Sequence, residues 1–168
     1  MSALSPKSFP EKVGIHLKAI KREKVESMDL EEIRECLGNI KAWVRRSEAW
    51  WLENPNLDVE GMARLMVETG ARLATVTASR APEGEFRMIY HWDLQGQLLN
   101  FITVTRQASL PSIARICPAA DWIEREIHDY FAVNFAGREL PPLVLSGQDP
   151  PGIFSWNFQW KGKEGGHA

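Results

Sequence analysis

Residues 118–131 read Pro118-Ala-Ala-Asp-Trp-Ile-Glu-Arg-Glu-Ile-His-Asp-Tyr-Phe131. This stretch predicts one short helix, because Asp121 is a good N-cap and Glu124 three positions later completes a capping box. Arg125 has Asp121 one turn behind it and Asp129 one turn ahead, so it can bridge two carboxylates along one face. Hydrophobic side chains recur at helical spacing, at Ile123, Ile127, Tyr130 and Phe131. The sequence therefore predicts an amphipathic helix.

Glu126 has a different environment in this predicted helix. Trp122 lies four residues before it and Tyr130 four residues after it, so the carboxylate shares a helix face with two large rings. A carboxylate in such surroundings is costly unless a cation or a hydrogen-bond donor meets it. We expect that donor to come from this chain or from a partner.

These residues also resemble the signature of a known family. Glu124-Arg125-Glu126, followed by Asp129 and the aromatic pair Tyr130-Phe131, is similar to the signature of the thirty-kilodalton subunit of proton-pumping NADH:quinone oxidoreductase (complex I). The same module occurs in energy-converting membrane-bound nickel–iron hydrogenases and formate hydrogenlyase-type complexes. In that family a His or Lys follows after six residues, whereas this chain has Arg138, which keeps the positive charge. Pro142 and the aliphatic residues after it match the close of the motif.

The resemblance covers residues 57–145, and it is much weaker in the first forty residues and in the tail. Quinone-reducing members usually have Gly-His-x-Asp-Leu-Arg-Arg after the helix. Residues 137–142 here read Gly-Arg-Glu-Leu-Pro-Pro, which favours the hydrogenase-like branch.

The resemblance implies a cofactor-free structural subunit in the peripheral arm of a membrane-bound oxidoreductase. The implied partners are a large catalytic subunit (the forty-nine-kilodalton subunit of complex I, or its hydrogenase counterpart) and iron–sulfur subunits. Iron–sulfur clusters, and nickel–iron in the hydrogenase-like branch, would belong to those partners. This chain would be cytoplasmic and held at the inner face of the cell membrane through other subunits. One alternative is the thirty-kilodalton subunit of a proton-pumping NADH:quinone oxidoreductase, and a second is a free-standing small-ligand binding module or enzyme.

Motif residues are the ones that the resemblance implies at the interface or in its support. They are Asp121, Trp122, Glu124, Arg125, Glu126, Asp129, Tyr130, Phe131, Arg138 and Pro142. Among them we expect Glu126 and Arg125 to hold the interface together, with Asp129 orienting Arg125. Glu124 and His128 also lie on one helix surface, but ordinary exposed pairs have the same spacing. We therefore expect no catalytic residue, and no cofactor or metal ligand, in this chain.

Composition limits the other classes of function. A chain of 168 residues with 44% hydrophobic content can form one compact core, and a formal net charge of −2 provides no field that attracts nucleic acid. No apolar run approaches the ~20 residues that span a bilayer, and no signal-peptide pattern opens the chain. Cys36 and Cys117 are far apart in the sequence and form no CxxC motif, so an iron–sulfur or zinc site is not expected. A chain with only two cysteines also fits a reducing compartment. Metal binding through His91 or Asp93 has no supporting ligand cluster.

The chain outside the motif predicts further helices and strands. We expect a helix capped by Asp29 with Glu32 at its third position, and a second helix from Asp58 to Gly70. Residues 40–52 predict a hairpin, with a helix as the competing interpretation. Strands are expected at residues 72–78, at residues 86–92, where hydrophobic and polar side chains alternate, and at residues 98–105. Turns are expected at residues 82–84 and 95–96, and a helical turn is expected to begin at Ser109. These elements predict an α+β, two-layer domain with a mostly antiparallel, hairpin-built sheet and helices on one face.

Three segments follow from this pattern: an N-terminal arm (1–28), the α+β domain that resembles the family (29–145) and an extended aromatic tail (146–168). Residues 11–27 fit either a short amphipathic docking helix or a solvated basic segment. In the tail, aromatic residues alternate with polar ones, at Phe154, Trp156, Phe158 and Trp160. An extended backbone would place these rings on one side. They would then pack on their own domain or, as the resemblance implies, lie along a neighbouring subunit.

Overall fold

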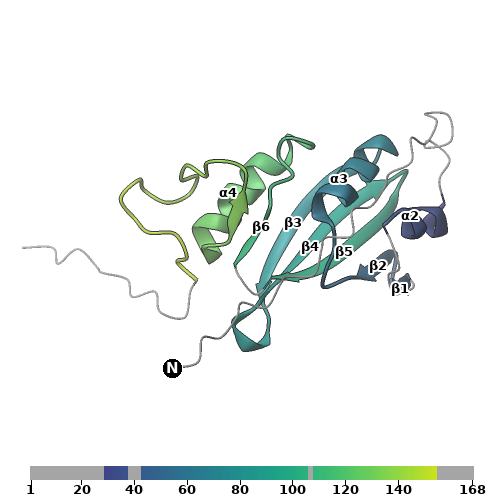
Figure 1. Cartoon of the computed structure of the whole chain (residues 1–168), viewed down its shortest axis with the longest axis horizontal. Coiled ribbons are helices and arrows are strands. Elements are labelled where there is room, and N and C mark those ends of the chain that lie inside the picture. The colour runs from purple at the N-terminus through teal and green to yellow at the C-terminus, as the bar shows by residue number, and fades with distance from the viewer. Residues whose placement is uncertain (1–28, 38–42, 106–107, 155–168) are drawn as a thin grey trace, which may run out of the picture.

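The computed structural model describes residues 29–37, 43–105 and 108–154. Within these ranges the chain forms, in order, α2 (Leu30–Cys36), β1 (Val44–Arg46), β2 (Ala49–Glu53), α3 (Val59–Glu68), β3 (Arg72–Arg80), the 3-10 turn η1 (Pro82–Gly84), β4 (Phe86–Leu94), β5 (Gln97–Thr105), β6 (Ser109–Pro111), α4 (Ala120–Phe131) and β7 (Asn134–Ala136) (Figure 1). The predicted α+β class is confirmed.

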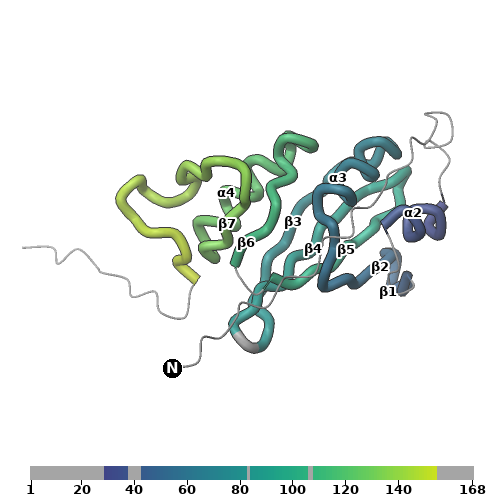
Figure 2. The backbone as a smooth tube through the Cα atoms, in the orientation of Figure 1, coloured from purple at the N-terminus to yellow at the C-terminus, as the bar shows by residue number. Residues whose placement is uncertain are grey.

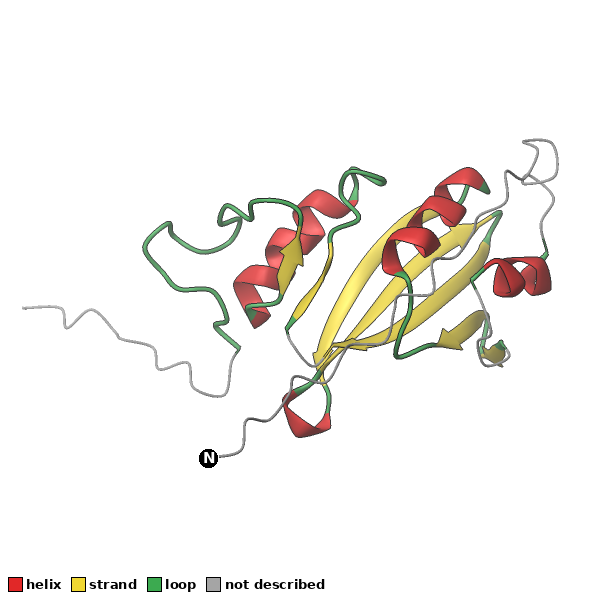
Figure 3. Ribbon diagram, in the orientation of Figure 1, coloured by secondary structure: helices red, strands yellow, loops and turns green. Residues whose placement is uncertain are grey.

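The main sheet of the described residues has five strands in the order β1-β2-β5-β4-β3 (Figure 3). Neighbouring strands are antiparallel except β2 and β5, which pair in parallel from Ala49↔Leu98 to Glu53↔Ile102. The expected hairpins β1–β2, β3–β4 and β4–β5 are present. The parallel pair between them makes the sheet mixed, which the sequence did not predict.

One face of this sheet forms the core. Alternate residues of β4 are buried, as predicted, at Phe86, Met88, Tyr90 and Trp92. The same hydrophobic cluster contains Ile33 of α2, Met66 of α3 and Ile127 of α4, so all three helices pack on one side. Fully burying a side chain such as Met66 contributes about 1.5–3 kcal/mol. Figure 1 shows α3 lying across this face of the sheet.

Local capping signals specify the first two helices correctly. Asp29 accepts from the amides of Glu31 and Glu32 while the Glu32 carboxylate accepts from the Asp29 amide, which is the predicted capping box. Asp58 caps α3 by accepting from the Gly61 amide at 3.0 Å. Gln95 and its neighbouring glycine both have positive φ, 51° and 84°, as a tight two-residue hairpin turn requires.

Other expectations need correction or lie outside the described residues. Ser109–Pro111 is a strand and not the start of a helical turn; the turn comes later, where the amide of Cys117 donates to the Ile113 carbonyl at 2.8 Å. The first strand of the hairpin expected over residues 40–52 is Val44–Arg46, and its turn follows that strand. Residues 40–42 and the expected arm 1–28 lie outside the described residues.

Helix α4 lies between two short strands in the sequence. β6 and β7 pair in parallel, from Ser109↔Asn134 to Pro111↔Ala136, and α4 connects them. The chain after β7, yellow in Figure 2, then returns beside α4 and ends its described part at Phe154. Within the described ranges, no helix has both the length and the hydrophobicity that a bilayer crossing needs.

Candidate functional site

The candidate site is the signature helix α4 with residues 137–154, the return segment, which runs back along it. The helix begins at Ala120 after the N-cap Ala119, which makes no side-chain capping bond. The predicted capping box of Asp121 and Glu124 is therefore wrong. Both carboxylates are used elsewhere: Asp121 pairs with Arg138, and Glu124 binds residues before the helix. Tertiary partners thus outcompete the local cap.

Glu124 is a buried acid, 1% exposed, on the inner side of α4. Its carboxylate accepts from the Ser112 hydroxyl at 2.6 Å and from the Ile113 amide at 2.7 Å. The Arg138 guanidinium lies 3.3 Å away and also binds Asp121. Burial raises the pKa of Glu124, and the hydrogen bonds from Ser112, Ile113 and Arg138 oppose this rise. The residue that departs from the family pattern, Arg138, is thus the cation that meets the buried acid.

Asp129 is the second buried carboxylate of α4, also 1% exposed. One of its oxygens accepts from three successive main-chain amides, those of Leu143, Val144 and Leu145, at 2.9, 2.7 and 3.2 Å. Burial acts to raise the pKa of Asp129, but these three amides outweigh burial and hold the pKa below its ordinary value. Asp129 therefore fixes the return segment. The predicted contact of Asp129 with Arg125 is not present: Asp129 accepts from amides of the return segment, and Arg125 donates to carbonyls of the same segment.

Arg125 binds the same return segment from elsewhere on the helix. Its Nε donates to the Pro141 carbonyl at 2.8 Å and its Nη2 to the Pro142 carbonyl at 2.9 Å. The predicted contact with Asp121 is present at 3.6 Å, whereas the predicted bridge to Asp129 is not among its contacts. The motif residues Arg125 and Pro142 are therefore hydrogen-bonded to each other within this domain.

The last turn of α4 is closed by residues 152–154. The amides of Gly152 and Phe154 donate to the carbonyls of Asp129 and Tyr130, at 2.7 and 2.9 Å, which satisfies acceptors that a helix end leaves open. Arg80 of β3 donates to the Phe154 carbonyl. The Phe154 ring lies 5.0 Å from Tyr130 and 5.9 Å from Phe131. The tail thus begins on its own domain.

The expected rings beyond Phe154 lie outside the described residues. These are Trp156, Phe158 and Trp160. Whether they pack on this domain or on a neighbour stays a prediction.

Trp122 and Glu126 form what we call the outer face of α4. Trp122 is 70% exposed, the highest value among the exposed large hydrophobic residues described. Glu126 is also exposed, and it has no hydrogen bond or ion pair with any described residue. The expected cation for Glu126 is therefore not supplied within the described part of this chain.

The buried carboxylates of α4 are not the one that the sequence pattern indicated. The pattern predicted a costly environment beside two rings for Glu126, whereas Glu124 and Asp129 are the buried acids. The signal was present in the spacing: Ala120, Glu124 and Ile127 lie at helical intervals and are all buried.

The remaining polar candidates have ordinary partners. His91 contacts Thr77 and Asn100 at 2.6 and 2.5 Å, and Asp93 pairs with Arg72 at 3.1 Å. Among the described residues, no group of three or more His, Cys, Asp or Glu side chains could hold a metal ion.

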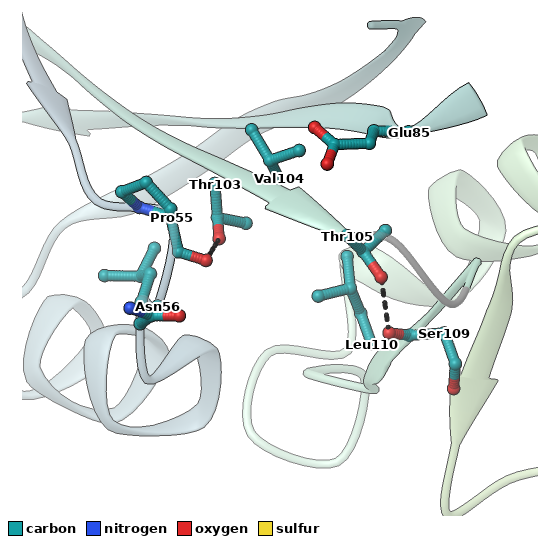
Figure 4. Close-up of a pocket in the computed structure, with 9 residues that line it drawn as sticks. Pro55, Asn56, Glu85, Thr103, Val104, Thr105, Ser109 and Leu110 are labelled. Carbon is teal, nitrogen blue, oxygen red and sulfur yellow. Dashed lines mark hydrogen bonds between the residues drawn. The ribbon is translucent and has the colours of Figure 1, made fainter. Parts of the chain in front are cut away.

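A groove of about 620 Å³ has no residue of α4 in its lining; Figure 4 shows the residues that do line it. Its lining residues are Pro55, Asn56, Leu57, Glu85, Thr103, Val104, Thr105, Ser109 and Leu110.

Fold and site geometry together define the class: an α+β domain of the kind found in chains of respiratory complexes. One chain of the membrane-bound sulfane sulfur reductase, an archaeal respiratory membrane complex, is similar with a TM-score of 0.62 and 28% identity, over 72% of this chain and 76% of that one. A trypsin-resistant fragment (1-134) of Nqo5 shares the fold, with a TM-score of 0.51 and 22% identity over 66% of this chain and 94% of that one.

Residues 55–152 match the family described as respiratory-chain NADH dehydrogenase, 30 Kd subunit, and the chain belongs to this family. The C subunit of the NADH-quinone oxidoreductase of Ruegeria sp. (strain TM1040) is 33% identical over 82 residues, which are 44% of this chain and 41% of that protein. The chain spans less than half of the length of the curated relatives that it matches, from 6% to 41%. The resemblance that the motif indicated is confirmed.

Proposed function

We propose that this chain is a cofactor-free structural subunit in the peripheral arm of a membrane-bound oxidoreductase. In this proposal the outer face of α4 docks against the large catalytic subunit, near the iron–sulfur subunits. The observation that carries the proposal is the exposure of Trp122, 70%, on a helix that the buried carboxylates Glu124 and Asp129 fix to the rest of the domain. Tryptophan is among the residues that dominate binding energy at protein interfaces.

Rigidity is the physical contribution of such a subunit. Glu124, Arg125 and Asp129 bind segments before and after α4, so the helix cannot shift without breaking several hydrogen bonds to charged groups. A preorganised surface binds with a smaller loss of conformational entropy. Neighbouring redox centres need positions fixed to within about half an ångström, and a rigid clamp helps to supply this without holding a cofactor.

Glu126 would supply charge selectivity at this face. A carboxylate that is covered on docking needs a cation from the partner, and the described residues leave Glu126 without one. We therefore propose a Lys or Arg of the large subunit opposite Glu126. The cofactors of the complex, iron–sulfur clusters and, in the favoured branch, nickel–iron, would belong to partner subunits.

Two branches of the family remain as candidates for the complex. The sequence after β7 favours an energy-converting, hydrogenase-like complex. The similarity to the Ruegeria protein favours the alternative, a thirty-kilodalton subunit of a proton-pumping NADH:quinone oxidoreductase. In either branch we propose a cytoplasmic position, peripheral to the membrane through other subunits.

The experiment is a purification of the native complex through a tag on this chain. The proposal expects the large subunit and iron–sulfur subunits to copurify. Nickel-ligating cysteines in that large subunit would identify a hydrogenase, and their absence would exclude the hydrogenase-like branch. The remaining hypothesis, a free-standing ligand-binding module or enzyme, predicts a ligand-dependent melting shift of the purified chain without partners.

A further inference from the structure

The groove of Figure 4 lies where strand β2 leaves the sheet. The last main-chain bond between β2 and β5 runs from the Asn54 amide to the Ile102 carbonyl, at 2.9 Å. The chain then turns away, because the Leu57 amide donates to the Asn54 carbonyl at 3.2 Å and the Asn56 amide to the Asn54 side chain at 3.0 Å. β5 continues for three residues beyond this point, to Thr105. Over those residues β5 has no paired strand on the β2 side among the described residues.

Val104 is the residue whose main chain faces this opening. Main-chain groups of a strand alternate in direction with period two, so the N–H and C=O of Val104 point the same way as those of Ile102, away from β4. In a continued parallel ladder the Val104 amide would donate to the Asn54 carbonyl, but the Leu57 amide occupies that carbonyl. Within the described residues, neither group of Val104 has a hydrogen-bond partner on this side. Val104 also lines the groove.

The other polar groups of the groove are already used to fix its walls. The Thr103 hydroxyl donates to the Pro55 carbonyl at 3.2 Å, and the Thr105 hydroxyl donates to the Ser109 carbonyl at 3.0 Å (Figure 4). These bonds tie the β5 edge to the chain on both sides of the opening. The groove is therefore a preformed gap that contains a main-chain donor and acceptor without a partner among the described residues.

We propose that this groove binds an extended peptide segment of a partner subunit, which adds to the main sheet as a strand beside β5. The amide and the carbonyl of Val104 match what a neighbouring strand offers. No lining residue is Lys, Arg or His, so nothing in the lining attracts a small anion. Leu57 and Leu110 in the lining favour aliphatic side chains. The segment thus carries aliphatic residues that face the walls.

This site goes beyond the docking face proposed above. None of its lining residues belongs to α4 or to the return segment, so the two contacts can be lost separately. The relatives of this chain include a chain of an archaeal respiratory membrane complex, so a neighbouring subunit is the source that we propose for the segment.

The test is amide hydrogen exchange, followed by mass spectrometry, on the native complex and on the isolated full chain. The Val104 amide is expected to exchange at least tenfold more slowly in the complex. Equal rates in the two samples would overturn the proposal. Protection that is already present in the isolated chain, and is lost when the chain is ended after Phe154, would assign the groove to this chain's own tail and would also overturn it.

A substitution supplies a second readout. Val104→Pro removes the amide that faces the groove, together with the valine side chain, and proline is tolerated where a strand amide has no partner. The variant is expected to lower recovery of the partner subunit, whereas the matched control Val104→Thr, which keeps the amide, is not. Equal recovery with both variants would contradict the proposal. Exchange on the wild-type protein decides the question if Val104→Pro does not fold.

Discussion

Arg138 lies with its guanidinium 3.3 Å from the carboxylate of Glu124, which is buried at the centre of α4. The same carboxylate binds Ser112 and Ile113, which follow β6. One acid therefore joins three parts of the chain: the turn before the helix, the helix itself and the segment after β7. The family pattern places a His or Lys where this chain has Arg138. The guanidinium of Arg138 has two terminal nitrogens, and it binds Asp121 with one and Glu124 with the other.

Arg138→Met should destabilise the isolated chain, because Glu124 stays buried and loses its cation. Ser112 and Ile113 still donate to the carboxylate, so we expect a loss of about 2–3 kcal/mol in the free energy of unfolding. Urea unfolding followed by tryptophan fluorescence measures this. Arg138→Lys is the matched control and should lose less. An unchanged midpoint for Arg138→Met would show that the pair contributes nothing to stability.

Asp129→Ala should release the return segment from α4. The three amides at 143–145 would lose a charged acceptor, at a cost of about 2 kcal/mol. Hydrogen exchange of residues 141–154 should accelerate more than exchange of β4 and β5. Glu139→Ala, at an exposed position in the same segment, serves as the control. Uniform acceleration over the whole domain would contradict a local role.

The two buried acids should give stability changes of opposite sign with pH. The pKa of Asp129 is lowered, so its contribution is present above its unfolded pKa of about 3.9 and is lost as pH falls through the lower folded pKa. The pKa of Glu124 is raised by burial, so stability falls as pH rises from its unfolded pKa of about 4.3 through the folded one. Urea midpoints measured against pH should lose the first change in Asp129→Asn and the second in Glu124→Gln. Reversed signs would refute these assignments.

Local signals in the sequence are sufficient for much of the fold. The Asp29 and Asp58 caps and the tight turn at Gln95 depend on residues within a few positions of one another, and each is predicted correctly. The parallel pairing of β2 with β5 is not, because it joins residues about fifty positions apart with no local signature. Strands β6 and β7 are three residues each, too short for alternation to be recognised.

The candidate site is predictable as a set of residues but not as a set of contacts. Asp121 has the sequence of an N-cap, yet an arginine seventeen positions later takes its carboxylate. Asp129 has the spacing of an ion pair with Arg125, yet main-chain amides of the return segment bind it. Such long-range partners cannot be read from helical spacing. Burial of Glu124 could have been read from its place among Ala120 and Ile127.

Substitutions on the outer face of α4 should leave the isolated domain intact. Trp122 and Glu126 are exposed, so Trp122→Ala and Glu126→Ala are expected to change the free energy of unfolding by less than about 0.5 kcal/mol. Urea unfolding of the two variants beside the wild type checks this. A larger loss would mean that these side chains support the fold and would remove them from the proposed docking face.

Copurification of the large subunit with these same variants tests the central claim most directly. The proposal predicts that recovery of the large subunit falls with Trp122→Ala and Glu126→Ala, by tenfold or more for Trp122→Ala. Glu60→Ala, an exposed position on α3, should retain wild-type recovery. Turnover per assembled complex should be unchanged, since no reaction is assigned to this chain. Normal assembly with lost turnover, or a redox centre bound to the purified chain alone, would contradict the account.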